Sequence, residues 1–258
     1  MRALDALRQA DVIACEDTRV TSKLLAIHGI ASPLVPYHEH NAGRVGPRLI
    51  ERLKNGETVA LVSDAGTPLV SDPGYKLVRA CLEEKIPVTP LPGASSILAA
   101  LVVSGLPTDR FFFAGFLPPK SAARLSALAE IAEIPATLVF LETAKRLTAA
   151  LQDMAAVLGV REAAVARELT KKFEETRRGT LDDLAAHYRE AGAPRGEVTI
   201  VVAPFAGQGI DDTELDRLLL AALDGASVKD AAQIVTAATG LQKKRVYARA
   251  LVLKEGRE

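Results

Sequence analysis

A chain of 258 residues has room for one large domain or two smaller ones, each with its own core. Its composition, 48% hydrophobic and 25% charged, is that of an ordinary globular protein, and 32 basic side chains balance 32 acidic ones. This balance excludes a global field that would draw the chain to nucleic acid or lipid, so a polyanionic partner must meet local basic patches.

The sequence contains no signal for a membrane or for secretion. Its longest apolar runs are strand-length, short of the roughly 18 residues of a membrane span, and the N-terminal MRALDALRQADVIACED lacks a secretory apolar segment. Cys15 and Cys81 stand in apolar runs without CxxC spacing, which predicts small core residues in a reducing compartment. We therefore expect a cytoplasmic protein.

Strand and helix patterns alternate through the first half. DVIAC (11–15) leads into an amphipathic stretch that ends at His28-Gly29. TVALVS (58–63) precedes a helix over 75–84, and PVTPL (87–91) precedes SSILAALVVSG, which predicts a buried helix ending at Gly105. This alternation is typical of a parallel sheet with crossover helices.

The pattern changes near SGLPTDR (104–110), which indicates a linker. FFFAGF (111–116), ATLVFLE (136–142), AAVARELT (163–170), FEETRRGT (173–180) and EVTIVVA (197–203) read as strands, some separated by hairpin-sized gaps. From residue 211 onward the pattern is helical. The sequence thus predicts an α/β fold with a parallel-sheet domain at 1–108, a mixed-sheet domain at 109–206 and a helical tail at 207–258.

Two loops stand where strands give way to helices, the usual ligand position in parallel sheets. DAGTPLVSDPG (64–74) combines glycines for close backbone approach with prolines that stiffen the path. LPGASS (91–96) places hydroxyls and free N–H groups at a helix start. Each alone reads as a tight turn, but the two together favour a small-molecule site. Neither GxGxxG nor GxxxxGK[ST] occurs, which disfavours the usual dinucleotide and P-loop sites.

Seven motifs in order resemble the tetrapyrrole methylase superfamily, and within it the ribosomal RNA 2′-O-methyltransferases. They are ACEDTR (14–19), YHEHN (37–41), DAGTPLVSDPG, PGASS, FFFAGFLP (111–118), RELTKKFEE (167–175) and RGEVTIVV (195–202). The resemblance implies two α/β domains that bind S-adenosylmethionine between them, a homodimer, and methylation of a cytidine ribose in small-subunit ribosomal RNA, either free or in the assembled subunit. The cofactor residues it implies are Asp64, Ala65, Gly66, Pro68, Ser95, Ser96, Gly115, Phe116 and Glu142.

The sequence departs from this family in two places. Such chains usually open with a strand and a TPIGNLxD-type loop before the helix matched by RALDALRQAD, so we expect a first strand upstream of Met1. Without it, central ladder groups would stay unpaired, and the 258-residue form would be poorly soluble or bind the cofactor weakly. FLETAKRL (140–147) stands where the family reads FYESPHRL, so the role of that histidine does not carry over to Lys145.

Candidates for the catalytic groups lie in two of the motifs. A ribose hydroxyl needs a base as its proton leaves, and the available groups are Glu16, Asp17, Arg19, His38, Glu39 and His40. On a strand, His38 and His40 would share a face and could form a metal pair, but no third ligand stands at a recognisable spacing, so we assign no metal. An ion pair of Asp17 with Arg19 at a helix start is an equal alternative to catalysis.

Two basic stretches suit RNA. Arg167, Lys171, Lys172, Arg177 and Arg178 cluster around Phe173, which could stack on a base, although lysines also protect sheet edges. In SVKDAAQIVTAATGLQKKRVYARAL (227–251), a helix, a turn at Gly240 and a basic helix resemble a helix-turn-helix, or else a plain helical cap. Its RNA-facing candidates are Lys243, Lys244, Arg245 and Arg249.

Three functions compete at this point. The resemblance favours the ribosomal RNA methyltransferase, whereas a tetrapyrrole methyltransferase would need cations for the macrocycle's carboxylates. The expected upstream strand keeps a third possibility open, an RNA-binding protein without a cofactor.

Overall fold

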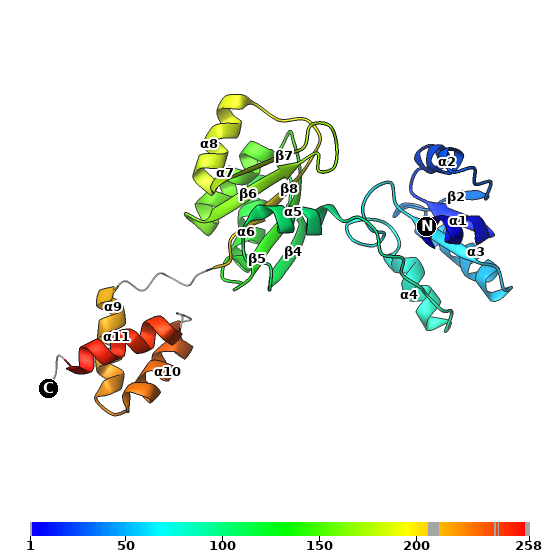
Figure 1. Cartoon of the computed structure of the whole chain (residues 1–258). Coiled ribbons are helices and arrows are strands. Elements are labelled where there is room, and N and C mark those ends of the chain that lie inside the picture. Colours follow the sequence, from blue (N-terminus) through cyan, green and yellow to red (C-terminus); the bar gives the residue numbers. More distant parts are fainter. Residues whose placement is uncertain (1, 206–211, 240, 242, 256–258) are drawn as a thin grey trace. The chain divides into compact units, whose positions relative to one another are not determined.

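The structure, a computed structural model, describes residues 2–205, 212–239, 241 and 243–255. The chain divides into two compact units, Met1–Ala99 and Ala100–Glu258 (Figure 1). The helices and strands of the first unit are α1 (Arg2–Gln9), β1 (Val12–Cys15), α2 (Thr18–Ile27), β2 (Leu34–Pro36), α3 (Ala42–Lys54), β3 (Val59–Val62), α4 (Tyr75–Glu83) and the first residues of α5 (Ser96–Ser104).

The first unit is built on a parallel sheet of three strands in the order β2-β1-β3. Successive side chains of a strand point to opposite faces, and all four residues of the central strand β1 are fully buried. Val12 and Ala14 pack in one core with α3 and α4, whereas Ile13 and Cys15 pack in another with α1 and α2. Helices therefore cover both faces of the sheet, as expected for a parallel one.

Two expectations for the first half are wrong. Residues 87–91 form no strand, and Pro87, Pro90 and Pro92 lack the N–H groups that a strand ladder requires. Helix α5 forms, but Leu98 and Val102 are exposed, so it is not the buried helix predicted from its apolar sequence. The cysteine prediction is confirmed, because Cys15 and Cys81 are both buried core residues. Burial also raises the pKa of each thiol.

The second unit holds the predicted mixed sheet and the helical tail. Its remaining elements are β4 (Phe111–Phe116), α6 (Ser121–Ile131), β5 (Thr137–Thr143), α7 (Leu147–Leu158), β6 (Glu162–Arg167), β7 (Glu175–Thr180), α8 (Leu181–Ala191), β8 (Glu197–Val202), α9 (Asp212–Leu223), α10 (Val228–Thr239) and α11 (Lys243–Glu255). The five strands lie in the order β4-β5-β8-β6-β7, with β4 and β5 parallel and the other neighbours antiparallel.

A single core joins this sheet to its helices. Phe140 of β5 and Ile200 of β8 are fully buried with Leu128, Leu151 and Leu184 of α6, α7 and α8. A capping box starts α8: the Thr180 hydroxyl accepts from the Asp183 N–H at 3.1 Å, and the Asp183 carboxylate accepts from the Thr180 N–H. The sheet therefore has a firm helical layer, and β4 and β7 are its edges.

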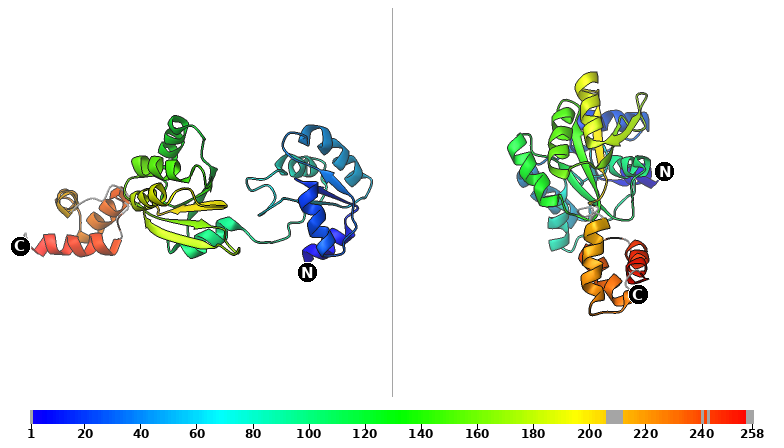
Figure 2. Two further views of the ribbon diagram at one scale, coloured as in Figure 1. Left: turned by 90° about the horizontal axis from the view of Figure 1, so that it is seen from above. Right: turned by 90° about the vertical axis from the view of Figure 1, so that its left-hand side faces the viewer.

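The tail forms a helical cluster with its own core (Figure 2). Leu215 and Leu219 of α9 are four residues apart, as are Val246 and Ala250 of α11, so each pair lies on one helix face. Val235 of α10 completes this buried set. The predicted turn at Gly240 lies outside the described residues. In the described part of the chain, no helix is both long enough and apolar enough to cross a membrane.

Candidate functional site

Three polar segments leave the same edge of the first sheet. Because β2, β1 and β3 are parallel, their carboxyl ends meet there, followed by residues 37–41, 16–19 and 63–74 respectively. The backbone N–H of Asp17 donates to Asp64 Oδ1 at 3.2 Å, and the N–H of Tyr37 donates to the carbonyl of Cys15 at 2.7 Å. The structure thus brings the ACEDTR, YHEHN and DAGTP motifs together at one edge.

Asp17 is the N-cap of α2. Its carboxylate accepts from the Arg19 N–H at 2.8 Å and from the Arg19 guanidinium at 2.6 to 3.2 Å. These hydrogen bonds from Arg19 lower the pKa of Asp17 to about 2. The carboxylate is therefore ionised at neutral pH and already holds a cation, which makes it a poor proton acceptor.

The YHEHN segment is a closed turn and not a strand. Its backbone is fixed by Asn41, whose side chain accepts from the His38 N–H and donates to the Pro36 carbonyl, both at 2.9 Å. The predicted shared strand face of His38 and His40 is wrong, because β2 ends at Pro36 and the two rings meet edge to face with centroids 6.0 Å apart. His38 Nδ1 is buried and has no hydrogen-bond partner.

Glu39 points to a different neighbour. It forms an ion pair with Lys76 at the start of α4, with both side chains largely exposed. Among the described residues, no three His, Cys, Asp or Glu side chains gather as they would around a metal ion.

The DAGTP loop is held in an unusual conformation. Leu69 and Ser71 have φ values of +74° and +61°, which side-chain-bearing residues rarely adopt, so the surrounding structure must impose them. Gly66 also has a positive φ, +71°, and a Cβ built on it would approach only Asp72, at 4.0 Å. The backbone at Gly66 therefore faces open space at the sheet edge.

The charges of this loop suit a cationic ligand. Residues 61–74 contain the carboxylates of Asp64 and Asp72 and no lysine or arginine. Asp64 is exposed. The loop itself adds negative charge and no cation, which favours a ligand that carries an ammonium and a sulfonium. The Asp64 carboxylate and the open space at Gly66 therefore fit the methionine part of S-adenosylmethionine.

The second predicted loop has an ordered helix start. Ser95 Oγ accepts from the Leu98 N–H at 3.4 Å, Ser96 is the first residue of α5, and Ser96 is exposed. No strand precedes this loop, so the prediction that it follows a strand at the edge of the sheet is wrong.

Gly115, Phe116 and Glu142 lie near the carboxyl ends of the neighbouring parallel strands β4 and β5. A bulge interrupts the β4–β5 register between Phe113 and Gly115, and Gly115 has a φ of +67°, which glycine adopts without strain. Phe116 pairs with Leu141 and is 53% exposed. The side chain of Glu142, in contrast, is 1% exposed.

The first predicted RNA-binding stretch, around Phe173, lies in the hairpin of β6 and β7. Most of its cations already have an acidic partner. Glu175 accepts from Arg167 at 2.6 Å and from Arg177 at 3.0 Å, which lowers the pKa of Glu175. Lys171 pairs with Glu168 at 2.9 Å.

The other two cations of the hairpin differ from one another. Arg178 donates to the carbonyls of Val103 and Ser104 and so caps the C-terminus of α5. Lys172 lies over the ring of Phe173, 5.6 Å from its centroid, and Phe173 is 64% exposed. Lys172 has no carboxylate partner among the described residues.

The tail also contains both paired and unpaired cations. Arg245 pairs with Asp212 at 2.9 Å, and Arg249 makes a two-pronged pair with Asp216 at 2.6 and 2.7 Å, which joins α11 to α9. Lys243 and Lys244, at the start of α11, are exposed. Within the described ranges neither lysine has an acidic partner.

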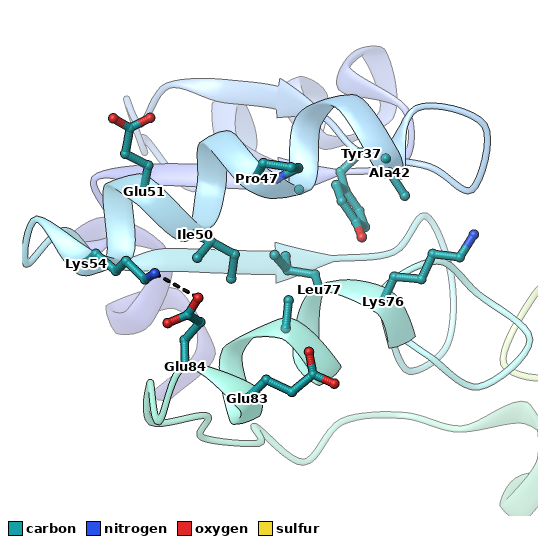
Figure 3. Close-up of a pocket in the computed structure, with 13 residues that line it drawn as sticks. Tyr37, Ala42, Pro47, Ile50, Glu51, Lys54, Lys76, Leu77, Glu83 and Glu84 are labelled. Atoms are coloured by element: carbon teal, nitrogen blue, oxygen red, sulfur yellow. Dashed lines mark ion pairs between the residues drawn. The ribbon is translucent and has the colours of Figure 1, made fainter.

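Sequence reasoning missed a groove between α3 and α4, shown in Figure 3. It has a volume of about 560 Å³ and an apolar floor that includes Tyr37, Ile50 and Leu77. Lys54 and Glu84 form an ion pair at one end, 2.8 Å apart. The small residues of AGRVG in α3 are the only sequence signal for it. None of the predicted site residues lines this groove between α3 and α4.

A model of the family described as Tetrapyrrole (Corrin/Porphyrin) Methylases matches residues 1–185. The chain belongs to this family. A second model, described as the RsmI C-terminal HTH domain, matches residues 209–254. The predicted tetrapyrrole-methylase fold is thereby confirmed, and the tail matches the helix-turn-helix domain that its sequence resembles.

Relatives and solved structures agree with this assignment. The chain is 50% identical over 256 residues to "Ribosomal RNA small subunit methyltransferase I" of Mesorhizobium japonicum, covering 99% of this chain and 87% of that protein. It is 46% identical to the enzyme of the same name from Micromonospora olivasterospora, over 96% of this chain and 80% of that one. The fold is similar to uroporphyrin-III C-methyltransferase from Thermus thermophilus, solved with S-adenosylhomocysteine. The TM-score is 0.53 and the identity 20%, over 78% of this chain and 89% of that one.

Proposed function

We propose that this chain transfers a methyl group from S-adenosylmethionine to small-subunit ribosomal RNA, at the ribose 2′-oxygen of a cytidine. Relatives that align over nearly the whole chain are named "Ribosomal RNA small subunit methyltransferase I". The observation that carries the proposal in the structure is the strained, cation-free loop 63–74 at the carboxyl edge of a parallel sheet. It suits a sulfonium cofactor and lies next to the polar ACEDTR and YHEHN segments.

The cofactor residues that we propose are those that the family resemblance implies. Asp64 offers a carboxylate to the ammonium, while the backbone of Ala65, Gly66 and Pro68 lies against the methionine part. Ser95 and Ser96 supply hydroxyls from the start of α5, and Gly115 and Phe116 contribute from the second unit. When bound, S-adenosylmethionine supplies a methyl group that is already activated by its sulfonium. The chain's own task is therefore chiefly to orient the RNA hydroxyl.

Among the catalytic candidates, we assign the proton-accepting role to His38. Its ring is half-buried in the turn after β2, and its Nδ1 makes no hydrogen bond, so no protein group competes for a proton on this ring. Asp17 and Arg19 serve as positioning residues, because their mutual hydrogen bonds hold the start of α2. Glu39 fixes α4 through Lys76.

For the RNA, we assign direct contacts to the unpaired lysines. Lys172 would meet a phosphate while Phe173 stacks on an exposed base, and Lys243 and Lys244 would meet a second stretch of backbone. The substrate is free ribosomal RNA or the assembled small subunit. We further propose that the chain is cytoplasmic and forms a homodimer; sedimentation at several concentrations would test the dimer. The domain bounds 1–108, 109–206 and 207–258 remain a prediction.

The other two functions are less well supported than RNA methylation, although the family model and the fold are shared with tetrapyrrole methyltransferases. A tetrapyrrole substrate carries several carboxylates, and the loop 61–74 offers it no cation. An RNA-binding protein without a cofactor would have no need of the strained loop around Gly66.

The test has two stages. Calorimetric titration with S-adenosylmethionine should show binding to the purified chain. Labelled methyl transfer should then proceed into small subunits from a strain that lacks this ribose methylation, and not into fully methylated subunits or a uroporphyrinogen. Binding without transfer to any of the three would overturn the proposed reaction.

A further inference from the structure

The segment Leu117–Lys120, directly after Phe116, is held by side chains from two other elements. Pro118 and Pro119 have no N–H, so the segment has few donors with which to stabilise its own path. Instead its carbonyls accept hydrogen bonds from two guanidinium groups, one before α7 and one in α6.

The first guanidinium belongs to Arg146. Its Nη2 donates to the Leu117 carbonyl at 2.6 Å and to the Pro118 carbonyl at 3.3 Å. The same nitrogen lies 3.1 Å from Glu142 Oε2. The other oxygen of Glu142 accepts from the Thr143 N–H at 2.7 Å, which fixes the carboxylate against its own backbone.

The second guanidinium belongs to Arg124, which is 3% exposed. Its Nη1 donates to the carbonyls of Pro118 and Pro119 at 3.3 and 3.2 Å. Asp153 of α7 balances its charge at 2.6 Å and also accepts from the Ser121 hydroxyl at 2.9 Å. Each side of the segment is thus held by an arginine with its own carboxylate.

We infer that Glu142 is a positioning residue, which acts through Arg146 to fix Leu117–Lys120 and thereby Gly115 and Phe116. Its side chain is 1% exposed, so a ligand atom does not reach it in this conformation, and its Oε2 lies at ion-pair distance from Arg146 although it accepts no hydrogen bond. This inference rests on the proposed function, in which Gly115 and Phe116 contact S-adenosylmethionine.

A double-mutant cycle separates positioning from direct contact. Glu142→Gln, Arg146→Met and the double variant are titrated with S-adenosylmethionine by calorimetry. If Glu142 acts only through Arg146, each single change weakens binding about ten-fold and the double change weakens it no further. Hydrogen exchange of the peptide 114–121 without cofactor should accelerate in all three variants, which loss of a mere cofactor contact would not cause.

An exposed ion pair of the same spacing and a conservative variant serve as controls. Arg79 and Glu83 form an exposed ion pair with the same four-residue spacing, so Arg79→Met and Glu83→Gln should change neither readout. Arg146→Lys keeps the charge beside Glu142 and one donor, so it should fold and bind more tightly than Arg146→Met, and it replaces that variant if the latter unfolds. Multiplying losses, or unchanged exchange in Glu142→Gln, would overturn the inference. Failure of the wild type to bind the cofactor would instead overturn the proposed function.

Discussion

The salt dependence of RNA binding should distinguish the paired cations from the unpaired ones. Each phosphate contact that is lost lowers the log–log salt slope by roughly 0.7 to 0.9. Lys243 and Lys244 have no acidic partner in the described chain, so changing both to alanine should lower the slope by roughly 1.4 to 1.8, two contacts at that value each. Arg245→Gln with Arg249→Gln should leave the slope unchanged, because Asp212 and Asp216 already hold those guanidiniums.

The arginine variants should show their effect in stability. Both pairs join α11 to α9 near the surface, where ion pairs contribute little, so their loss should lower the melting temperature of the tail only slightly. Binding of a fluorescent small-subunit RNA fragment, followed by anisotropy from about 50 to 200 mM salt, measures the slope. A slope that falls as much for the two arginines as for the two lysines would refute the reasoning, since it would mean that the arginines leave their carboxylates to bind phosphate.

Three further variants test the first unit. Gly66→Val should abolish S-adenosylmethionine binding. Gly29 has a similar φ of +61° and open space around it, so Gly29→Val should carry the same backbone strain and still bind the cofactor normally. His38→Ala should lower kcat by about 10²- to 10⁴-fold without changing cofactor affinity, and a smaller loss would remove His38 as the base. Asp17 has a folded pKa of about 2, below its ordinary 3.8, so its stabilising effect is present above the higher value and lost as pH falls towards the lower. The melting-temperature difference between wild type and Asp17→Asn should therefore shrink between about pH 4 and pH 2, and a constant difference would contradict the assigned ion pair.

The fold was predictable where local pattern and burial agree. VIAC is apolar throughout, as a strand covered on both faces must be, and it became the central strand β1. PVTPL has the same apolar character, but its prolines remove ladder donors, and the prediction of a strand there was wrong. Apolar content alone does not distinguish the two. The SSILAALVVSG helix shows the same limit, because apolar composition predicted its burial and Val102 is nonetheless exposed.

The site was only partly predictable, because its determinants are distant contacts. The DAGTP loop could be found from its glycine, proline and strand-end position. That Asp17 is held by Arg19 follows from two neighbouring residues, and an ion pair was indeed one of the alternatives. Which rings lack a partner, as His38 Nδ1 does, depends on how three segments meet at the sheet edge. No local pattern contains that information.

Charge illustrates why the same limit matters for function. The chain has as many acidic as basic side chains, and acids hold three of the five cations in the first basic stretch and two of the four in the tail. Non-specific attraction to phosphate, which grows with every unpaired cation, is thereby kept low. At these two surfaces Lys172, Lys243 and Lys244 have no carboxylate partner among the described residues, so we propose that shape and stacking on Phe173 contribute to the selectivity of the proposed reaction.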